Sequence, residues 1–199
     1  MVIEVRILPR AGLDKKSIVK AAAELANEIG YDNISLKILA EHLGVRSPSL
    51  YNHISGLDEL RHELMLYGWR CISSEIISAV NGLAGYDAIC EMCRAFYRFA
   101  SNNKGIFNAM LWYNKYADEE TLEATKLLFS IMYSLFTQIN IPRWKAEHII
   151  RTFRSFLEGF SLLVNNDSFG HSASIDESFD ISLDILIAGM KAQEEKPHE

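Results

Sequence analysis

The side chains with the clearest chemistry lie in the segment VRSPSLYNHI, residues 45–54. Arginine pairs with the O6 and N7 atoms of guanine, asparagine pairs with N6 and N7 of adenine, and serine is more permissive. Arg46, Ser49 and Asn52 therefore have the chemistry to read base edges in a DNA groove. Taken singly, a residue of this kind is better explained as an ordinary surface group, so the prediction depends on their common place on one short helix.

A second group around this segment suits phosphate oxygens, which accept hydrogen bonds from hydroxyl, imidazole and ammonium groups. Its members are Lys37, Ser47, Tyr51 and His53. Backbone amides near Gly56 would add to them, because the N-terminus of a helix attracts anions. We include Pro48 in the same predicted face, because it fits the first helical position after an N-cap at Ser47.

A helix this short is unstable alone, so other elements must hold it. Ala40 is small enough for a close helix crossing, Gly44 permits a left-handed turn, and Leu50 supplies one apolar anchor facing back. This spacing predicts a helix-turn-helix, in which the second helix enters the major groove.

Along the whole chain, apolar residues recur at helical spacing and predict an all-α protein of about nine helices. The predicted helices are 14–29, 35–44, a short one from Ser47, 55–80, 86–101, 103–115, 118–139, 142–165 and 175–192. Asp14 and Gly30 should bound the first helix, and Ser55 with Asp58 approximates a capping box. Residues 127–136 are apolar nearly all round, which predicts a central buried helix.

Composition narrows the function. The chain has 199 residues, 49% of them hydrophobic, and a formal net charge of −6, which excludes a general basic coat for nucleic acid or membrane surfaces. Residues 1–65 hold eight Lys and Arg against nine Asp and Glu, a net charge of −1, so DNA binding would need a local arrangement that includes the arm around Arg10. Three cysteines without a secretory signal predict a reducing cytoplasm, and the lack of a long apolar window predicts no membrane partner.

The segment LKILAEHLGVRSPSLYNHISGLDEL, residues 36–60, resembles the DNA-binding signature of the TetR family of bacterial transcriptional regulators. The resemblance covers about residues 12–64. It implies an all-α homodimer that binds operator DNA and a small-molecule effector. By this analogy Tyr51 and His53 contact phosphates, whereas Arg46, Ser47, Ser49 and Asn52 lie at or near bases. Many members carry lysine where Leu57 stands, so that phosphate contact is in doubt here.

The resemblance also implies a division of the chain. We expect an N-terminal extension at 1–13, a helix-turn-helix DNA-binding domain at 14–60, a helical ligand-binding and dimerisation domain at 61–192, and a tail at 193–199. Residues 151–190 resemble a TetR subgroup named for a Trp-His-Gly motif through Gly159-Phe160 and Asp176–Phe179, although Leu157 and Glu158 replace the Trp and His.

Large aromatic and sulfur side chains crowd the C-terminal half, which suits a hydrophobic core and also an apolar ligand pocket. The predicted pocket residues are Arg94, Tyr97, Phe107, Met110, Trp112, Tyr113, Met132, Tyr133, Phe136 and Phe156. The last two helices should form a four-helix dimer interface. Its predicted residues are Phe153, Gly159, Phe160, Leu163, Ile181, Leu183 and Ile187.

Other functions have weaker support. The sequence lacks G-x-G-x-x-G, P-loop and G-x-S-x-G motifs, and its six histidines show no metal-ligand spacing, so we expect no enzyme, cofactor or metal. Cys90 and Cys93 form a C-x-x-C inside a predicted helix, which favours structural cysteines but leaves a thiol-sensing regulator as an alternative. A helical dimeric binding module without DNA activity is a further alternative. The favoured function is a repressor released from its operator by a small, largely apolar molecule.

Overall fold

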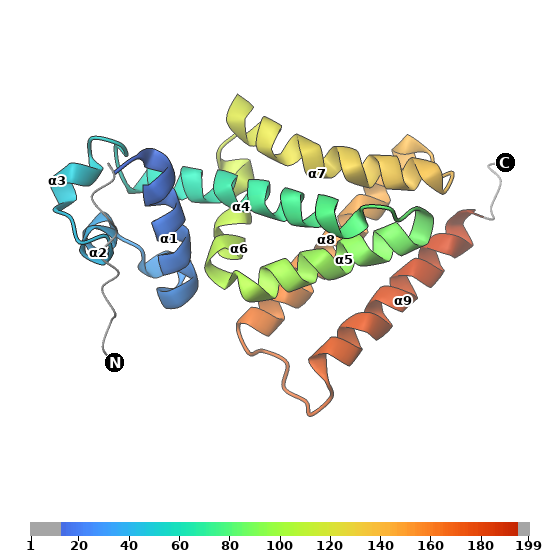
Figure 1. The fold of residues 1–199 in the computed structure, drawn as a ribbon. Coiled ribbons are helices and arrows are strands. Elements are labelled where there is room, and N and C mark those ends of the chain that lie inside the picture. Colours follow the sequence, from blue (N-terminus) through green and yellow to red (C-terminus); the bar gives the residue numbers. More distant parts are fainter. Residues whose placement is uncertain (1–12, 195–199) are drawn as a thin grey trace. The chain divides into compact units, whose positions relative to one another are not determined.

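The computed structural model describes residues 13–194, which form nine α-helices, two 3-10 helices and no strand (Figure 1). The α-helices are α1 (Lys15–Ile29), α2 (Leu36–His42), α3 (Ser47–Leu50), α4 (Leu57–Val80), α5 (Gly85–Asn102), α6 (Lys104–Met110), α7 (Glu119–Gln138), α8 (Arg143–Asn165) and α9 (Ile175–Glu194). The 3-10 helices are η1 (Tyr31–Asn33) and η2 (Tyr113–Lys115). The predicted all-α fold is confirmed. Most of the predicted N-terminal extension and tail lies outside the described residues.

Helix α1 begins and ends where its sequence predicts. The Asp14 carboxylate accepts a hydrogen bond from the Ser17 amide at 2.7 Å, and the Ser17 hydroxyl accepts one from the Asp14 amide at 3.1 Å. This reciprocal pair satisfies amides that an unfinished helix end leaves without partners. Gly30 ends the helix with a φ of +88°, a conformation that suits glycine.

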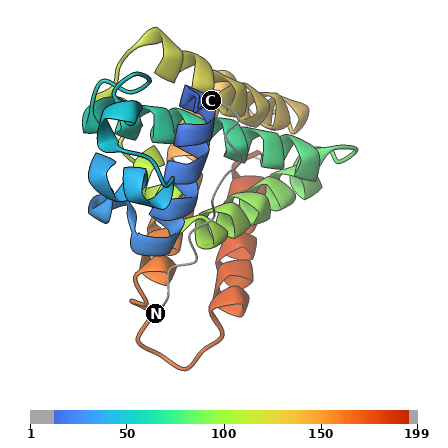
Figure 2. The same ribbon diagram turned by 60° about the vertical axis from the view of Figure 1, so that its left-hand side comes forward.

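Helices α2 and α3 form the predicted helix-turn-helix beside α1 (Figures 1 and 2). The Ser35 hydroxyl accepts a hydrogen bond from the Ile38 amide at 3.2 Å and so starts α2. After α2, Gly44 turns the chain with a φ of +66°, and the Val45 amide donates to the Ala40 carbonyl at 3.0 Å. The small residue and the glycine therefore hold the positions that the motif requires.

The predicted starts of α3 and α4 need correction. Extended Arg46, rather than Ser47, occupies the N-cap of α3, because the first turn closes from the Ser49 amide to the Arg46 carbonyl at 2.9 Å. Helix α4 begins at Leu57 instead of following an N-cap at Ser55. No box forms between Ser55 and Asp58. The longer side chain of Glu59 reaches back to the Ser55 amide instead.

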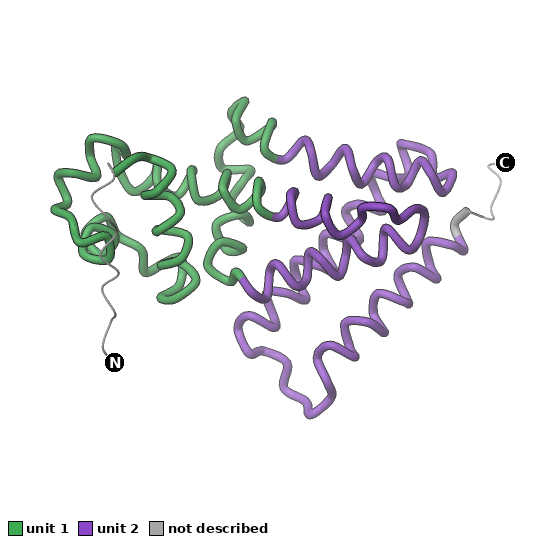
Figure 3. Tube along the Cα trace, viewed as in Figure 1, with its two compact units in different colours: residues 1–71, 103–124 green, residues 72–102, 125–199 purple. Residues whose placement is uncertain are grey.

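The described chain divides into two compact units (Figure 3). The first contains the described residues up to Cys71 together with Asn103–Ala124, and the second contains Ile72–Asn102 and the described residues from Thr125 onward. Helix α4 runs unbroken across residue 60, where the sequence predicts a domain limit. The helix-turn-helix unit thus includes α6, although the prediction assigns residues 103–115 to the larger domain. The predicted limits themselves stay a prediction.

Two glycines let α6 pack closely within the first unit. A Cβ atom on Gly105 would lie 2.0 Å from the Ala26 carbonyl oxygen, and one on Gly68 would lie 2.6 Å from Cγ of Met110. Asn27 of α1 also accepts hydrogen bonds from the Gly105 and Ile106 amides at 3.0 and 3.2 Å, which caps the start of α6. Helix α6 is therefore fixed against α1 and α4.

In the second unit, α5, α8 and α9 pack around aromatic rings. The Tyr97 ring stacks on Phe179 with centroids 4.2 Å apart, and Phe156 and Phe160 lie 5.5 and 5.4 Å from Phe179. These rings bury large apolar areas while their offset and edge contacts fix the packing. None of the helices among residues 13–194 combines the length and the apolar character needed to span a membrane.

The prediction of a central buried helix at 127–136 is wrong. In the single chain, α7 buries one face through Leu128, Met132, Leu135 and Phe136, whereas Leu127 is exposed together with Ser130 and Ser134. The buried positions recur at the 3.6-residue spacing of an amphipathic helix. Leucine also occurs on the exposed face, at Leu127, so the apolar composition of the segment predicts more burial than the helix has.

Candidate nucleic-acid interface

The predicted DNA-binding residues lie together on and around α3, in the first unit. Lys37, Arg46, Pro48, Tyr51 and Asn52 are exposed, and Ser47, Ser49, His53 and Gly56 are partly exposed. The Tyr51 side chain is the most telling, since a large ring that is 57% exposed stabilises no core. The residues thus form one polar surface, which we call the recognition face.

Two residues of the same segment anchor the recognition face from behind. Leu50 and Ile54 are both 0% exposed, so the polar and apolar side chains of residues 46–54 are fully separated. The His53 and Ile54 amides both donate to the Leu50 carbonyl at 2.9 Å, which closes the chain into a turn after α3. The short helix therefore derives its stability from its packing on α2 rather than from its own length.

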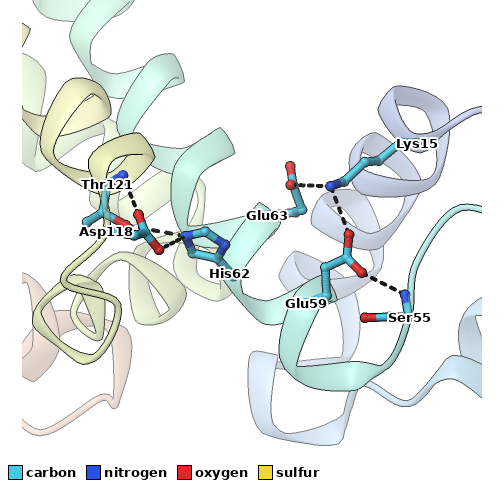
Figure 4. A network of polar contacts seen from close by, with 7 residues as sticks. All are labelled: Lys15, Ser55, Glu59, His62, Glu63, Asp118 and Thr121. Carbon is cyan, nitrogen blue, oxygen red and sulfur yellow. Dashed lines mark hydrogen bonds and ion pairs between the residues drawn. The ribbon is translucent and has the colours of Figure 1, made fainter.

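An ion-pair cluster holds the turn between α3 and α4 (Figure 4). The Glu59 carboxylate accepts hydrogen bonds from the Ser55 amide at 2.7 Å and from Lys15 Nζ at 2.9 Å. Lys15 also pairs with Glu63 at 2.6 Å. The Lys15 ammonium, followed by the Ser55 amide, lowers the pKa of Glu59 to about 2. No sequence motif marks this cluster, because Lys15 and Glu59 are 44 residues apart.

A second polar cluster lies on another side of α4, still within the first unit (Figure 4). His62 Nε2 lies 3.1 Å from Asp118 Oδ2 and 3.3 Å from Thr121 Oγ1, and the His62 ring lies 4.6 Å from that of Tyr116. Asp118 caps α7 by accepting from the Thr121 amide at 2.8 Å, and this hydrogen bond lowers the pKa of Asp118. The first turns of α4 are thus linked to the segment that joins α6 to α7.

Near this cluster, Lys115 Nζ lies 2.7 Å from Asp58 Oδ1, in the first turn of α4. Both side chains are exposed, so water screens their attraction. The pair nevertheless helps to orient α4, because it joins this helix, which follows the recognition face, to η2. Sequence reasoning missed this link as well, since an exposed lysine and an exposed aspartate are individually unremarkable.

Two cationic side chains of the recognition face are exposed, Lys37 and Arg46. The ammonium of Lys15, by contrast, is paired with two carboxylates, those of Glu59 and Glu63. The arm around Arg10 lies outside the described residues. Specific contacts and a second copy of the face would therefore have to supply the DNA affinity that net charge does not provide.

The predicted pocket residues fall into both units. Phe107, Met110, Trp112 and Tyr113 belong to the first, and Arg94, Tyr97, Met132, Tyr133, Phe136 and Phe156 belong to the second. Trp112 is 57% exposed, whereas Phe107 and Met110 are buried. Arg94 is already paired with Asp180 at 3.1 Å, and the Tyr97 hydroxyl donates to Asp176 at the same distance. The pocket itself stays a prediction.

The predicted dimer residues also separate into two sets. Phe153, Phe160, Leu183 and Ile187 are buried inside the single chain and so contribute to its core, while the dimer surface itself stays a prediction. Leu163 and Ile181 are exposed, and a Cβ atom on Gly159 would meet nothing within 4 Å. Ile185, which the prediction omitted, is 66% exposed one turn after Ile181. Spacing alone could not separate the core face of these helices from a second apolar face.

The cysteine pair does not resemble a reactive thiol site. Burial raises the pKa of Cys90 and, more strongly, that of fully buried Cys93, which lowers the fraction present as nucleophilic thiolate. Among residues 13–194, no three His, Cys, Asp or Glu side chains are grouped to hold a metal ion. The geometry of α5 therefore gives no support to the thiol-sensing alternative.

A three-helix unit that displays a polar helix over a buried anchor defines a helix-turn-helix DNA-binding protein. Residues 18–64 match the family described as "Bacterial regulatory proteins, tetR family", and residues 89–186 match the "Tetracyclin repressor-like, C-terminal domain". The uncharacterized HTH-type transcriptional regulator YobS of Bacillus subtilis is 33% identical over 183 residues, covering 92% of this chain and 95% of YobS. The chain belongs to the TetR family of transcriptional regulators.

Solved structures agree with this fold. A TetR variant from Acinetobacter baumannii AYE in complex with minocycline aligns with a TM-score of 0.70 and 21% identity, covering 93% of this chain and all of that chain. The TetR family protein ActR of Streptomyces coelicolor, in complex with actinorhodin, aligns with a TM-score of 0.67 and 18% identity, covering 94% of this chain and all of ActR. The finer resemblance to the Trp-His-Gly subgroup stays a prediction.

Proposed function

We propose that the protein is a ligand-responsive repressor that binds operator DNA as a homodimer and is released by a small, largely apolar molecule. The observation that carries this proposal is the recognition face, with Tyr51 57% exposed over Leu50 and Ile54 at 0%. Arg46, Ser49 and Asn52 would read base edges, while Tyr51, His53 and Lys37 would contact phosphates. Such a protein would act in the cytoplasm, where it meets chromosomal DNA.

The deciding experiment is selection of bound duplexes from random DNA by the purified protein, followed by a gel-shift titration of the selected duplex. Tyr51→Ala should abolish the shift, because the exposed ring and hydroxyl are removed without disturbing the core. Sedimentation analysis of the same variant should give the same oligomer as the wild type. If no duplex is enriched, the protein is a helical binding module without DNA activity. If Tyr51→Ala binds as tightly as the wild type, the recognition face is assigned wrongly.

Homodimerisation is supported by an apolar surface that the single chain leaves exposed on α8 and α9. Leu163, Ile181 and Ile185 are 44, 55 and 66% exposed, and nearby Gly159 would allow a close helix approach. Isolated exposed apolar residues are common, but three on neighbouring helices make a better dimer surface. Two copies related by a two-fold axis would present their recognition faces to half-sites about one DNA turn apart or further.

The proposed release acts through α4. Within the first unit, the segment from Tyr113 to Thr121 holds the first turns of this helix through Lys115 and Asp118, and the same turns carry Glu59 beside the recognition face. A ligand that shifts this segment would shift α4 and change the separation of the two recognition helices. The resemblance in fold to ActR and TetR, solved with actinorhodin and minocycline, supports a small-molecule effector.

A compound screen tests this release step. The selected duplex carries a fluorescent label, and the readout is its release from the protein. A true effector must weaken DNA binding by the same factor by which DNA weakens effector binding. Two calorimetric titrations, with and without the duplex, measure this factor independently. A compound that binds tightly but leaves DNA affinity unchanged would rule out the proposed coupling for that compound.

A further inference from the structure

Glu59 is in an unexpected place for a DNA-binding protein. It lies in the first turn of α4, close in sequence to Tyr51, His53 and Gly56, which are proposed to face phosphates. A carboxylate near phosphates should weaken binding by repulsion, and the N-terminal turn of a helix is where phosphates themselves gain from backbone amides. The helix N-terminus stabilises such a carboxylate in the folded chain, but this does not offset its repulsion of a nearby phosphate.

A compensating gain lies in the three segments that the Glu59 side chain joins (Figure 4). One carboxylate oxygen accepts from the Ser55 amide at 2.7 Å, and the other lies 2.9 Å from Lys15 Nζ at the start of α1. The Glu59 side chain is 30% exposed and that of Lys15 is 45% exposed. Glu63, one turn later in α4 and 14% exposed, takes the other side of the Lys15 ammonium at 2.6 Å.

The Ser55 amide is a sensitive point in the backbone. It directly follows Ile54, which is buried and whose own amide closes the turn after α3 onto Leu50. It also directly precedes Gly56, where the chain enters α4. Fixing Ser55 therefore fixes the exit of the recognition helix and the entry to α4 together, whereas α1 serves as the reference to which both are tied.

We propose that Glu59 and Lys15 are positioning residues for DNA recognition, which hold the α3–α4 turn without touching DNA themselves. This inference rests on the proposed function and deepens it. It gives the unusual consequence that removing a negative charge next to the DNA weakens binding. Simple electrostatics gives the opposite sign, so the two explanations can be separated by one measurement.

The test compares Glu59→Ala with Glu41→Ala, using the duplex selected by the wild-type protein. Glu41 is an exposed residue of α2 whose side chain makes no hydrogen bond or ion pair among the described residues. Both variants remove one negative charge from a helical position. Hydrogen bonds to charged groups contribute enough that Glu59→Ala should weaken binding by about tenfold or more, whereas Glu41→Ala should bind equally or more tightly.

A second pair of variants tests Lys15 and separates positioning from a direct phosphate contact. Lys15→Met is compared with Lys16→Met, since Lys16 is also exposed but makes no ion pair within residues 13–194. A lost phosphate contact lowers the slope of log affinity against log salt by about 1 and weakens all sequences alike. Lost positioning instead lowers the ratio of the affinity for the selected duplex to the affinity for a scrambled duplex. Lys15→Arg should restore that ratio.

Thermal unfolding of each variant keeps the result interpretable, because binding is measured well below the transition. If Glu59→Ala unfolds early, the comparison of Lys15→Met with Lys16→Met decides the question alone. Equal or tighter binding by Glu59→Ala, or an unchanged sequence preference in Lys15→Met, would overturn the inference while leaving the proposed function intact. Absence of DNA binding by the wild-type protein would instead refute the proposed function, and this inference with it.

Discussion

The recognition face and the α8–α9 surface differ in how their exposed residues relate to the core. On the recognition face, polar residues point outward and Leu50 and Ile54 point inward, so one short segment separates the two roles. On α9, apolar residues occupy both the core and the surface: Leu183 is 0% exposed and Ile185 is 66% exposed. Residue type therefore distinguishes surface from core in the first region but not in the second.

The largest expected effect comes from charging the exposed apolar residues of α9. Ile181→Glu combined with Ile185→Glu should raise the dimer dissociation constant about a thousandfold, because two side chains that would be buried become charged. Sedimentation velocity across a concentration series measures this constant. Leu83→Glu is the matched control, since Leu83 is 43% exposed in a loop elsewhere in the second unit.

A dimer that survives the double substitution would place the interface elsewhere and remove the contrast between the two regions. A variant that becomes monomeric, and whose unfolding temperature equals that of the highly diluted wild type, would strengthen the contrast between the two regions. DNA binding by that monomer should fall as well, because two half-sites would no longer be held by one particle.

The opposite substitution on the same helix tests the core assignment. Leu183→Ala should lower the free energy of unfolding by about 3 kcal/mol, because a fully buried leucine leaves a cavity. Chemical denaturation measures the loss. The dimer constant of the folded protein should stay within about threefold of the wild type, a change of less than 1 kcal/mol. A larger change in dimerisation than in stability would return Leu183 to the interface, as the sequence analysis placed it.

These two regions also explain what the sequence could and could not predict. The helix-turn-helix depends on contacts between near neighbours: Asp14 with Ser17, Ser35 with Ile38, and a left-handed turn at Gly44. Contacts between residues so close in the chain can be predicted from the sequence alone. The ion pairs that fix α4 join Lys15 to Glu59 and His62 to Asp118, across 44 and 56 residues, and only the fold brings them together. The same holds for burial on α8 and α9, where apolar residues cover more than one face.

A smaller effect should separate the residues within the recognition face. Arg46→Ala should cost about 2 kcal/mol of binding and relax the preference at one base position, as expected for a side chain that reads a base edge. Tyr51→Phe should weaken selected and scrambled duplexes by a similar factor of about three to ten, because only a phosphate contact is lost. Repeating the duplex selection with each variant shows which pattern occurs. Relaxed preference in Tyr51→Phe and uniform weakening in Arg46→Ala would exchange their proposed roles.

The smallest effect concerns the pH dependence of the cluster behind the recognition face. The pKa of Glu59 is lowered from 4.5 to about 2, so the folded protein binds the proton less tightly than the unfolded chain does. Its stabilising contribution is therefore complete above about pH 4.5 and disappears as the pH falls towards 2. Because water reaches the side chain, this contribution should be about 1 kcal/mol rather than the full value of the shift.

Glu59→Gln measures this contribution by difference from the wild type. The variant should be less stable by about 1 kcal/mol at pH 7, and the two unfolding curves should converge as the pH approaches 2. Taking the difference cancels the acid sensitivity of Asp14, Asp58 and Asp118, whose pKa values are also lowered. A stability gap that stays constant down to pH 2 would mean that the Glu59 charge contributes nothing. The link from α1 to the α3–α4 turn would then depend on packing of the side chains rather than on the ion pair.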